Sequence, residues 1–275
     1  MTPPMTPPSS SSSHVTRRAE IPQHRADYFA AQGVLLLWRD PPPPPIPTPG
    51  QPMAVPGNPA EGPELLLAVW DDGSVTGLNG HVDLGTGIRT ALAQIVAEEL
   101  DVPISAVHMV LGDTTRAPNQ GATIASATLQ IHAQPLRLAA AQARQWLLAE
   151  AAAQWGCPPE SLTLRDGLLQ GPGLGEAWPL GRLLQGRQAS LRLDPATPTK
   201  PAADYRLVGQ SVPRVDIPAK VRGEGDFVHD FRLPGMLHGR VVRPPYAGAD
   251  HGDFIGNTLE SVDEGSVAHI PGLRA

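Results

Sequence analysis

Residues 81–90 (HVDLGTGIRT) place two glycines between the end of an expected strand and the start of an expected helix. Backbone N–H groups at the positive end of a helix suit a phosphate or another anion. Glycine, which lacks a side chain, lets a ligand approach the main chain closely. Gly85, Thr86 and Gly87 are therefore candidate ligand-binding residues, with a purely structural turn as the open alternative.

A dinucleotide site of the Rossmann type is a second interpretation of this turn. Its fingerprint needs a third glycine, where this chain has Thr90, although an acidic residue, Asp113, follows the next expected strand. The segment before the turn alternates in polarity like a hairpin, whereas a Rossmann turn follows a buried parallel strand. This pattern disfavours a nucleotide site.

Small and hydroxylated side chains gather in a second segment, residues 118–128 (PNQGATIASAT), just before a long helical pattern. Loops of this composition present hydroxyls and main-chain amides to polar ligands. The alternative is an ordinary solvated connection that caps the helix. The candidate residues here are Thr123, Ile124, Ala125 and Ser126.

Composition excludes several classes of site. The formal net charge of −6 and the lack of a basic patch argue against nucleic acid as a partner. The single cysteine, Cys157, permits neither an internal disulfide nor an iron–sulfur cluster held by this chain, and the nine histidines show no metal-ligand spacing. Glu176, between glycines in GLGE, is interpreted as part of a surface turn. We see neither a signal peptide nor a membrane span.

Hydrophobic periodicity predicts a mixed α/β (α+β) fold with antiparallel pairs and two main helices. The first helix covers residues 88–100, with Leu92, Ile95, Val96 and Leu100 on one face and Glu98 and Glu99 on the other. The second runs from Pro135 to about Ala153. Strand character is expected at residues 65–70, 74–84, 107–111, 162–164, 168–169 and 227–243, with hairpin turns at 71–73 and 166–167.

A longer pattern resembles the molybdopterin-binding subunit of the xanthine dehydrogenase/aldehyde oxidase family, in its nicotinate dehydrogenase and isoquinoline oxidoreductase branch. That family carries G-x-V-x-x-G-x-G-x-x-T-A-L-x-Q, then A-E-E-L and a G-D-T loop. The matching residues here are Gly80, Val82, Gly85, Gly87, Thr90-Ala91-Leu92, Gln94, Ala97-Glu98-Glu99-Leu100 and Gly112-Asp113-Thr114. Downstream, residues 216–239 resemble the opening of the family's α/β hammerhead domain.

The resemblance implies a domain order: a disordered or Pro-rich region at 1–63, a molybdopterin-binding segment at 64–193, a linker at 194–204 and an incomplete hammerhead at 205–275. It implies that both candidate segments contact the pterin cofactor, in its cytosine dinucleotide form, and that no residue of this chain is catalytic or binds metal. Some relatives carry Gln where Thr86 stands, which puts one cofactor hydrogen bond in doubt. His132-Ala133-Gln134 replaces a glycine-rich stretch, which puts local backbone geometry in doubt.

The resemblance also implies partners and an activity: hydroxylation of an N-heteroaromatic compound or an aldehyde with oxygen from water. Iron–sulfur clusters would lie on a small [2Fe-2S] subunit, with a cytochrome subunit as an optional partner, in the cytoplasm or, through these partners, at the periplasmic membrane. The family's catalytic glutamate, in a glycine-flanked motif far downstream, has no counterpart here. We therefore expect either that a second polypeptide supplies the rest of the molybdenum subunit or that the chain is a truncated, non-catalytic remnant or assembly module. In both cases the chain alone is expected to be inactive.

Overall fold

A computed structural model describes residues 21–43, 49, 62–172, 175–224, 227–241 and 261–273. The chain divides into two compact units, Met1–Gly225 and Asp226–Ala275. Every site discussed below lies in the first unit. In the described part of the chain, no helix combines the length and the apolar composition that a membrane crossing requires.

A five-stranded mixed sheet forms the centre of the first unit, with strand order β4-β3-β2-β1-β8. The pairs β1–β2 and β2–β3 are antiparallel, whereas β3–β4 and β1–β8 are parallel. The central strand β2 is buried along its whole length, which explains its continuous apolar run. The strands are β1 (Val34–Arg39), β2 (Glu64–Trp70), β3 (Val75–Asn79), β4 (Val107–Leu111) and β8 (Gln188–Arg192).

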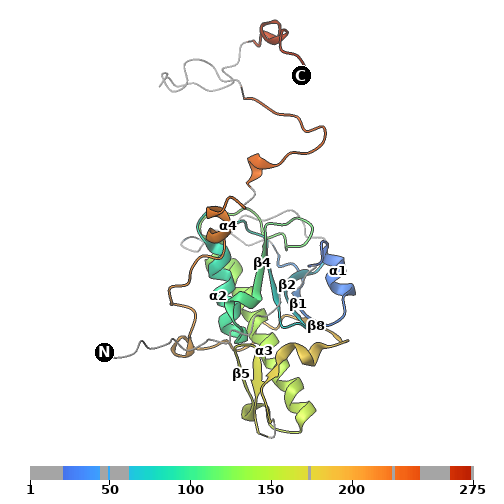
Figure 1. The fold of residues 1–275 in the computed structure, drawn as a ribbon, viewed down its shortest axis with the longest axis vertical. Coiled ribbons are helices and arrows are strands. Elements are labelled where there is room, and N and C mark those ends of the chain that lie inside the picture. The colour runs from blue at the N-terminus through green and yellow to red at the C-terminus, as the bar shows by residue number, and fades with distance from the viewer. Residues whose placement is uncertain are drawn as a thin grey trace, which may run out of the picture. The chain divides into compact units, whose positions relative to one another are not determined.

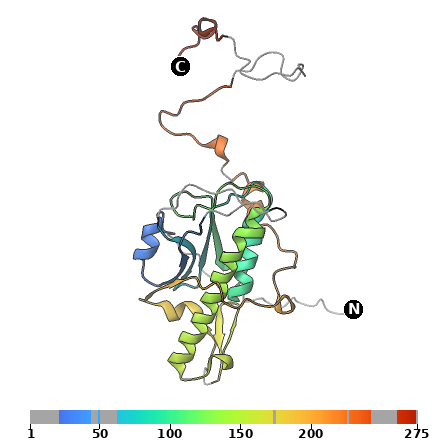
Figure 2. The ribbon, with the colours of Figure 1, turned by 180° about the vertical axis from the view of Figure 1, so that it is seen from behind.

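Two helices cover one face of this sheet, α2 (Ile88–Leu100) and α3 (Ala133–Trp155), and they lie side by side in both ribbon views (Figures 1 and 2). The buried stripe of α3 runs from Leu136 through Ala143 to Ala151. The short helix α1 (Arg25–Ala30) packs on the opposite face, where the rings of Tyr28 and Trp70 lie 5.8 Å apart. The sheet therefore has an apolar core on each side.

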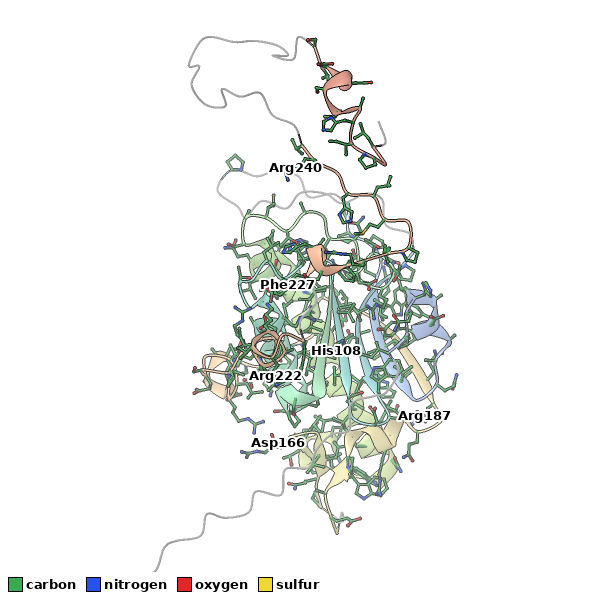
Figure 3. The ribbon with its side chains drawn as sticks, turned by 45° about the horizontal axis from the view of Figure 1, so that its top comes forward. His108, Asp166, Arg187, Arg222, Phe227 and Arg240 are labelled. Carbon is green, nitrogen blue, oxygen red and sulfur yellow. The ribbon has the colours of Figure 1, made fainter. Side chains whose placement is uncertain are left out.

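A small antiparallel sheet follows α3 and consists of β5 (Thr163–Arg165), β6 (Leu168–Gln170) and β7 (Trp178–Pro179). Asp166 and Gly167 form the turn between β5 and β6 with φ of 51° and 75°, as a tight hairpin requires. Asp166 is exposed at this turn (Figure 3). The remaining helical segments are η1 (Ile104–Ala106), η2 (Thr128–His132), η3 (Pro159–Ser161), η4 (Leu180–Leu184), η5 (Ala202–Asp204), α4 (Ile217–Val221), η6 (Val228–Asp230) and η7 (Glu264–Val267).

The structure confirms the helix at 88–100, the strands at 65–70 and 107–111 and both hairpin turns, and it differs from several expectations. Ordered structure does not begin at residue 64, because α1 and β1 belong to the sheet domain. The expected return strand at 74–84 ends at Asn79, and the second helix begins at Ala133 after a π-helical turn. Glu98 and Glu99 are buried, since residues from 200 to 208 pack against them.

A further correction concerns the second unit. The strand expected at 227–243 is absent from residues 227–241, where the structure describes the short helix η6. A strand needs a hydrogen-bonded neighbour, and no described segment pairs with these residues. Residues 242 and 243 lie outside the described residues.

Candidate functional site

Two loops lie next to each other at one end of the sheet. One follows β3 and the other precedes η2. The Gly80 amide donates to Gln120 Oε1 at 2.8 Å, and the Val82 amide donates to Thr123 Oγ1 at 3.0 Å. A Cβ atom at Gly80 would lie only 2.1 Å from the Pro118 carbonyl oxygen. The glycine is therefore required by the close approach of the two backbones.

The loops enclose a cleft of about 330 Å³. Six of the seven candidate residues line it: Thr86, Gly87, Thr123, Ile124, Ala125 and Ser126. The seventh, Gly85, lies in the same turn, and no atom comes within 4 Å of the position that its Cβ would take. Segments more than 30 positions apart in the sequence thus form one site, as two walls of a single cleft. Below, the glycine turn means residues 85–87 and the hydroxyl loop means residues 123–126.

Left-handed backbone conformations concentrate in both walls. Gly85 and Gly87 have φ of 94° and 80°, which glycine adopts without strain. Ala125 and Ser126 have φ of 51° and 56°, a region that non-glycine residues seldom occupy. Consecutive residues held in this region are typical of ligand-binding loops, where the surrounding structure maintains the strain.

Asp83 modifies the anion site that the sequence predicted at the glycine turn. Its carboxylate accepts hydrogen bonds from the amides of Gly85 at 2.9 Å, Gly87 at 3.2 Å and Arg89 at 3.1 Å. Desolvation raises the pKa of Asp83, but these three backbone donors outweigh it and bring the pKa below its ordinary value. The amides of both glycines are thus already satisfied by the chain's own carboxylate. What remains open to a ligand is the outer surface of the turn.

A buried histidine pair lies beneath the cleft and was not singled out from the sequence. The His81 side chain is fully buried, with Nδ1 2.7 Å from Thr128 Oγ1 and Nε2 3.3 Å from the Gln120 carbonyl oxygen. Its ring meets the His132 ring edge-on, with centroids 4.5 Å apart. His81 therefore joins the two loops from below. No local pattern marks this pair, because the two residues come from a loop and a π-helical turn 51 positions apart.

Both histidines are neutral at pH 7. Burial lowers the pKa of His81. Burial is also the largest cause of the lowered pKa of His132, which is about 4, and the charges of His81 and Arg39 nearby lower this pKa further. Among the described residues, the buried His132 Nε2 and Gln120 Nε2 atoms have no hydrogen-bond partner. Such atoms are uncommon in folded proteins and are typical of functional or water-filled regions.

The lining of the cleft suits binding and not acid–base catalysis. Hydroxyls of Thr86, Thr123 and Ser126 alternate with apolar side chains, and none of the described lining residues carries a titratable side chain. The apolar rim is largely exposed, with Leu84 at 69% and Leu129 at 47%. Such a mixture of hydroxyl groups and apolar surface is typical of sites for small organic ligands. Glu176 is exposed, as expected, while Gly173 and Leu174 lie outside the described residues. No group of three or more His, Cys, Asp or Glu side chains with metal-binding geometry occurs in the described part of the chain.

The comparisons with known proteins agree on one family. Residues 49–190, more than half of the chain, match the molybdopterin cofactor-binding domain. A nicotinate dehydrogenase subunit of Pseudomonas putida is 62% identical over 211 residues, which are 77% of this chain and 18% of that protein. The beta subunit of isoquinoline 1-oxidoreductase from Brevundimonas diminuta is 30% identical over 265 residues, covering 80% of this chain and 32% of that protein.

Among solved structures, quinoline 2-oxidoreductase from Pseudomonas putida 86 matches at 27% identity over 42% of this chain and 15% of that chain. Its TM-score of 0.37 is too low to establish a shared overall fold. The chain spans less than a third of the length of the two curated relatives. The family match covers both walls of the cleft, and this chain therefore belongs to the molybdopterin cofactor-binding domain family, as a relative of the molybdenum hydroxylases of the xanthine dehydrogenase and aldehyde oxidase type.

Proposed function

We propose that the chain supplies part of the cofactor site of a molybdenum hydroxylase, with the glycine turn and the hydroxyl loop holding a molybdopterin cofactor in its cytosine dinucleotide form. The observation that carries this proposal is the cleft that unites Thr86 and Gly87 with residues 123–126. The residues fit such a group: Gly85 faces open space, and hydroxyls line the opposite wall. Their role is to bind and orient, because the lining has no acid or base to move a proton.

The assembled enzyme hydroxylates an N-heteroaromatic compound or an aldehyde. The substrate C–H group and one water molecule become C–OH, two protons and two electrons, and the bound molybdenum cofactor supplies the redox chemistry. The electrons pass to a small [2Fe-2S] subunit and, in assemblies that contain one, to a cytochrome subunit. The similarity to a nicotinate dehydrogenase and an isoquinoline 1-oxidoreductase favours an N-heteroaromatic substrate.

The remaining part of the molybdenum subunit completes the site in this proposal, and its hammerhead domain begins within the expected segment 205–275, downstream of the residues that bind α2. The exposed apolar side chains of Phe231, Leu233 and Leu237 support a partner surface for that segment. The alternative function is a non-catalytic remnant or assembly module, which the absence of a base from the cleft lining also fits.

The test uses the full chain, produced alone or together with the part of the Pseudomonas putida nicotinate dehydrogenase relative that it does not match. Molybdenum and pterin per chain and oxidation of nicotinate and simple aldehydes are measured. We expect little cofactor on the chain alone and stoichiometric cofactor with turnover in the complemented pair. Cofactor without turnover would favour the assembly module, and no cofactor in either sample would contradict the proposal.

A matched pair of variants locates the site. Thr86→Trp places a large ring in the cleft and is expected to reduce the molybdenum content of the complemented pair by about tenfold, the effect of losing roughly 1.4 kcal/mol of binding. Glu160→Trp adds the same ring to an exposed position in η3, outside the cleft. Equal cofactor content in the two variants would show that the cofactor binds elsewhere.

A further inference from the structure

A polar stripe runs along α2 and binds a segment far downstream. Thr90, Gln94 and Glu98 are four positions apart, so they lie on one face of the helix. Gln94 Nε2 donates to the carbonyl oxygens of Leu207 at 3.0 Å and Gln210 at 3.2 Å, and Thr90 Oγ1 accepts from the Val215 amide at 3.0 Å. We call residues 198–216 the strap.

The strap is fixed firmly at the C-terminal end of α2. Glu98, only 3% exposed, accepts hydrogen bonds from the amides of Arg206, Leu207 and Val208 through one oxygen. Desolvation raises the pKa of Glu98, but these three amides and Lys200 outweigh it, so the pKa lies below its ordinary value. A carboxylate that binds three consecutive amides fixes the path of the backbone.

Two further carboxylates complete what we call the acid clamp, which consists of Glu98, Glu99 and Asp101. Glu99 accepts from the Lys200 amide at 3.0 Å, and Asp101 pairs with Lys200 Nζ at 2.6 Å. Asp101 also pairs with Arg206, a second residue of the strap. Lys200, in the expected linker at 194–204, and residues 206–208, just after the expected start of a hammerhead at 205, therefore bind the C-terminal end of α2.

The other end of the strap reaches the glycine turn through Arg214. Its Nη1 atom donates to the Gly85 carbonyl oxygen at 2.9 Å. The guanidinium lies against Gly87, where a Cβ would come within 3.3 Å of Arg214 Cδ and Nε. Asp216 accepts two hydrogen bonds from the guanidinium, at 3.0 Å from Nε and 2.7 Å from Nη2. Arg214 is thus a rigid support behind the turn, and it is not among the residues that line the cleft.

We propose that the strap, fixed by the polar stripe and the acid clamp, positions the glycine turn for its ligand through Arg214. Arg214 is a positioning residue: it holds the Gly85 carbonyl and the Gly87 backbone from outside the cleft. The part of this inference that concerns the ligand rests on the proposed function. The part that concerns the turn does not.

Hydrogen exchange on the full chain without cofactor tests the support itself. Arg214→Gln removes the planar double contact with Asp216, and we expect the amides of residues 85–89 to exchange about tenfold faster, as the loss of one charge-assisted hydrogen bond implies. Arg214→Lys should restore part of the protection. Arg222→Gln is the control, because Arg222 is an exposed arginine that pairs with Glu224 on the same segment (Figure 3). Unchanged exchange in Arg214→Gln would overturn the proposal.

The complemented pair provides the second measurement. Molybdenum per chain is expected to fall to roughly a third in Arg214→Gln and to remain at the parent value in Arg222→Gln, since a loosened supporting contact weakens the site that it holds. Faster exchange with unchanged molybdenum would overturn the positioning role. If the parent pair binds no molybdenum, the proposed function fails while the exchange result still decides whether Arg214 supports the turn.

Discussion

The two ends of α2 differ in how their polar groups are satisfied. At the C-terminal end, three buried carboxylates bind backbone amides and cations of the strap and of α3. At the N-terminal end, the loops keep residues in left-handed conformations, leave Leu84 exposed and bury His132 Nε2 without a partner among the described residues. One helix thus joins a closed structural region to an open region that is suited to a ligand.

This difference indicates where stability and function reside. Satisfied buried charges make the clamp sensitive to any lost partner. Strained loops with exposed apolar side chains contribute little to stability, but they can gain contacts when a ligand binds. Substitutions at the clamp should therefore reduce stability, whereas substitutions at the rim of the cleft should reduce binding.

The largest effect is expected at the clamp. Glu98→Ala removes the acceptor that the amides of Arg206, Leu207 and Val208 share, and it also removes a carboxylate paired with Lys200. It should lower the free energy of unfolding by about 3–5 kcal/mol. Urea denaturation of the full chain measures this, with Glu160→Ala as the exposed control. A loss below about 1 kcal/mol would show that the strap is not held by Glu98.

The second-largest effect on stability is expected at acidic pH, through the buried pair of His81 and His132. The pKa of His132 is about 4 in the folded chain and 6.5 for an ordinary histidine, so the unfolded chain binds the proton more tightly. Stability is complete above pH 6.5 and declines as the pH falls toward 4. Between pH 7 and pH 5 the loss should be about 2 kcal/mol.

Replacing the histidine isolates this contribution. His132→Phe should flatten the decline between pH 7 and pH 5, whereas His269→Phe, at an exposed histidine, should not. Urea midpoints across this pH range provide the measurement. An equal slope in the parent chain and in His132→Phe would mean that other groups cause the acid sensitivity.

A smaller effect is expected where the two loops touch. Gly80→Ala places a methyl group 2.1 Å from the Pro118 carbonyl oxygen, so the loops must separate, at about 1–3 kcal/mol. Gly239→Ala is the control, because no atom lies within 4 Å of its Cβ position. A thermal unfolding midpoint equal to that of the control would contradict the close contact.

The smallest effect on stability is expected at the rim of the cleft. Leu84→Ser should change the free energy of unfolding by less than about 0.5 kcal/mol, since Leu84 is already exposed. It should nevertheless reduce cofactor content in the complemented pair by up to about tenfold, because the ligand loses one apolar contact. Val221→Ser is the control, because Val221 is 80% exposed and does not line the cleft. An unchanged cofactor content in Leu84→Ser would show that the rim of the cleft does not contact the cofactor.

The sequence by itself determined the local elements and the two walls of the cleft. Apolar periodicity marked the first main helix and the strands at 65–70 and 107–111, and Asp-Gly pairs marked both hairpins. Glycine spacing and clustered hydroxyl residues identified the glycine turn and the hydroxyl loop, which the structure brings together in one cleft. These patterns extend over only a few neighbouring residues, so hydrophobic periodicity and turn-forming residues are sufficient to recognise them.

Only the tertiary structure decided which distant residues meet. It placed β1 between β2 and β8, buried Glu98 and Glu99 beneath a downstream segment, and brought His81 into contact with His132. The same glutamate is solvated or buried according to whether another segment covers it, and residues 200–208 lie about a hundred positions downstream. Helical period assigns a residue to a face, but it carries no information about what packs against that face.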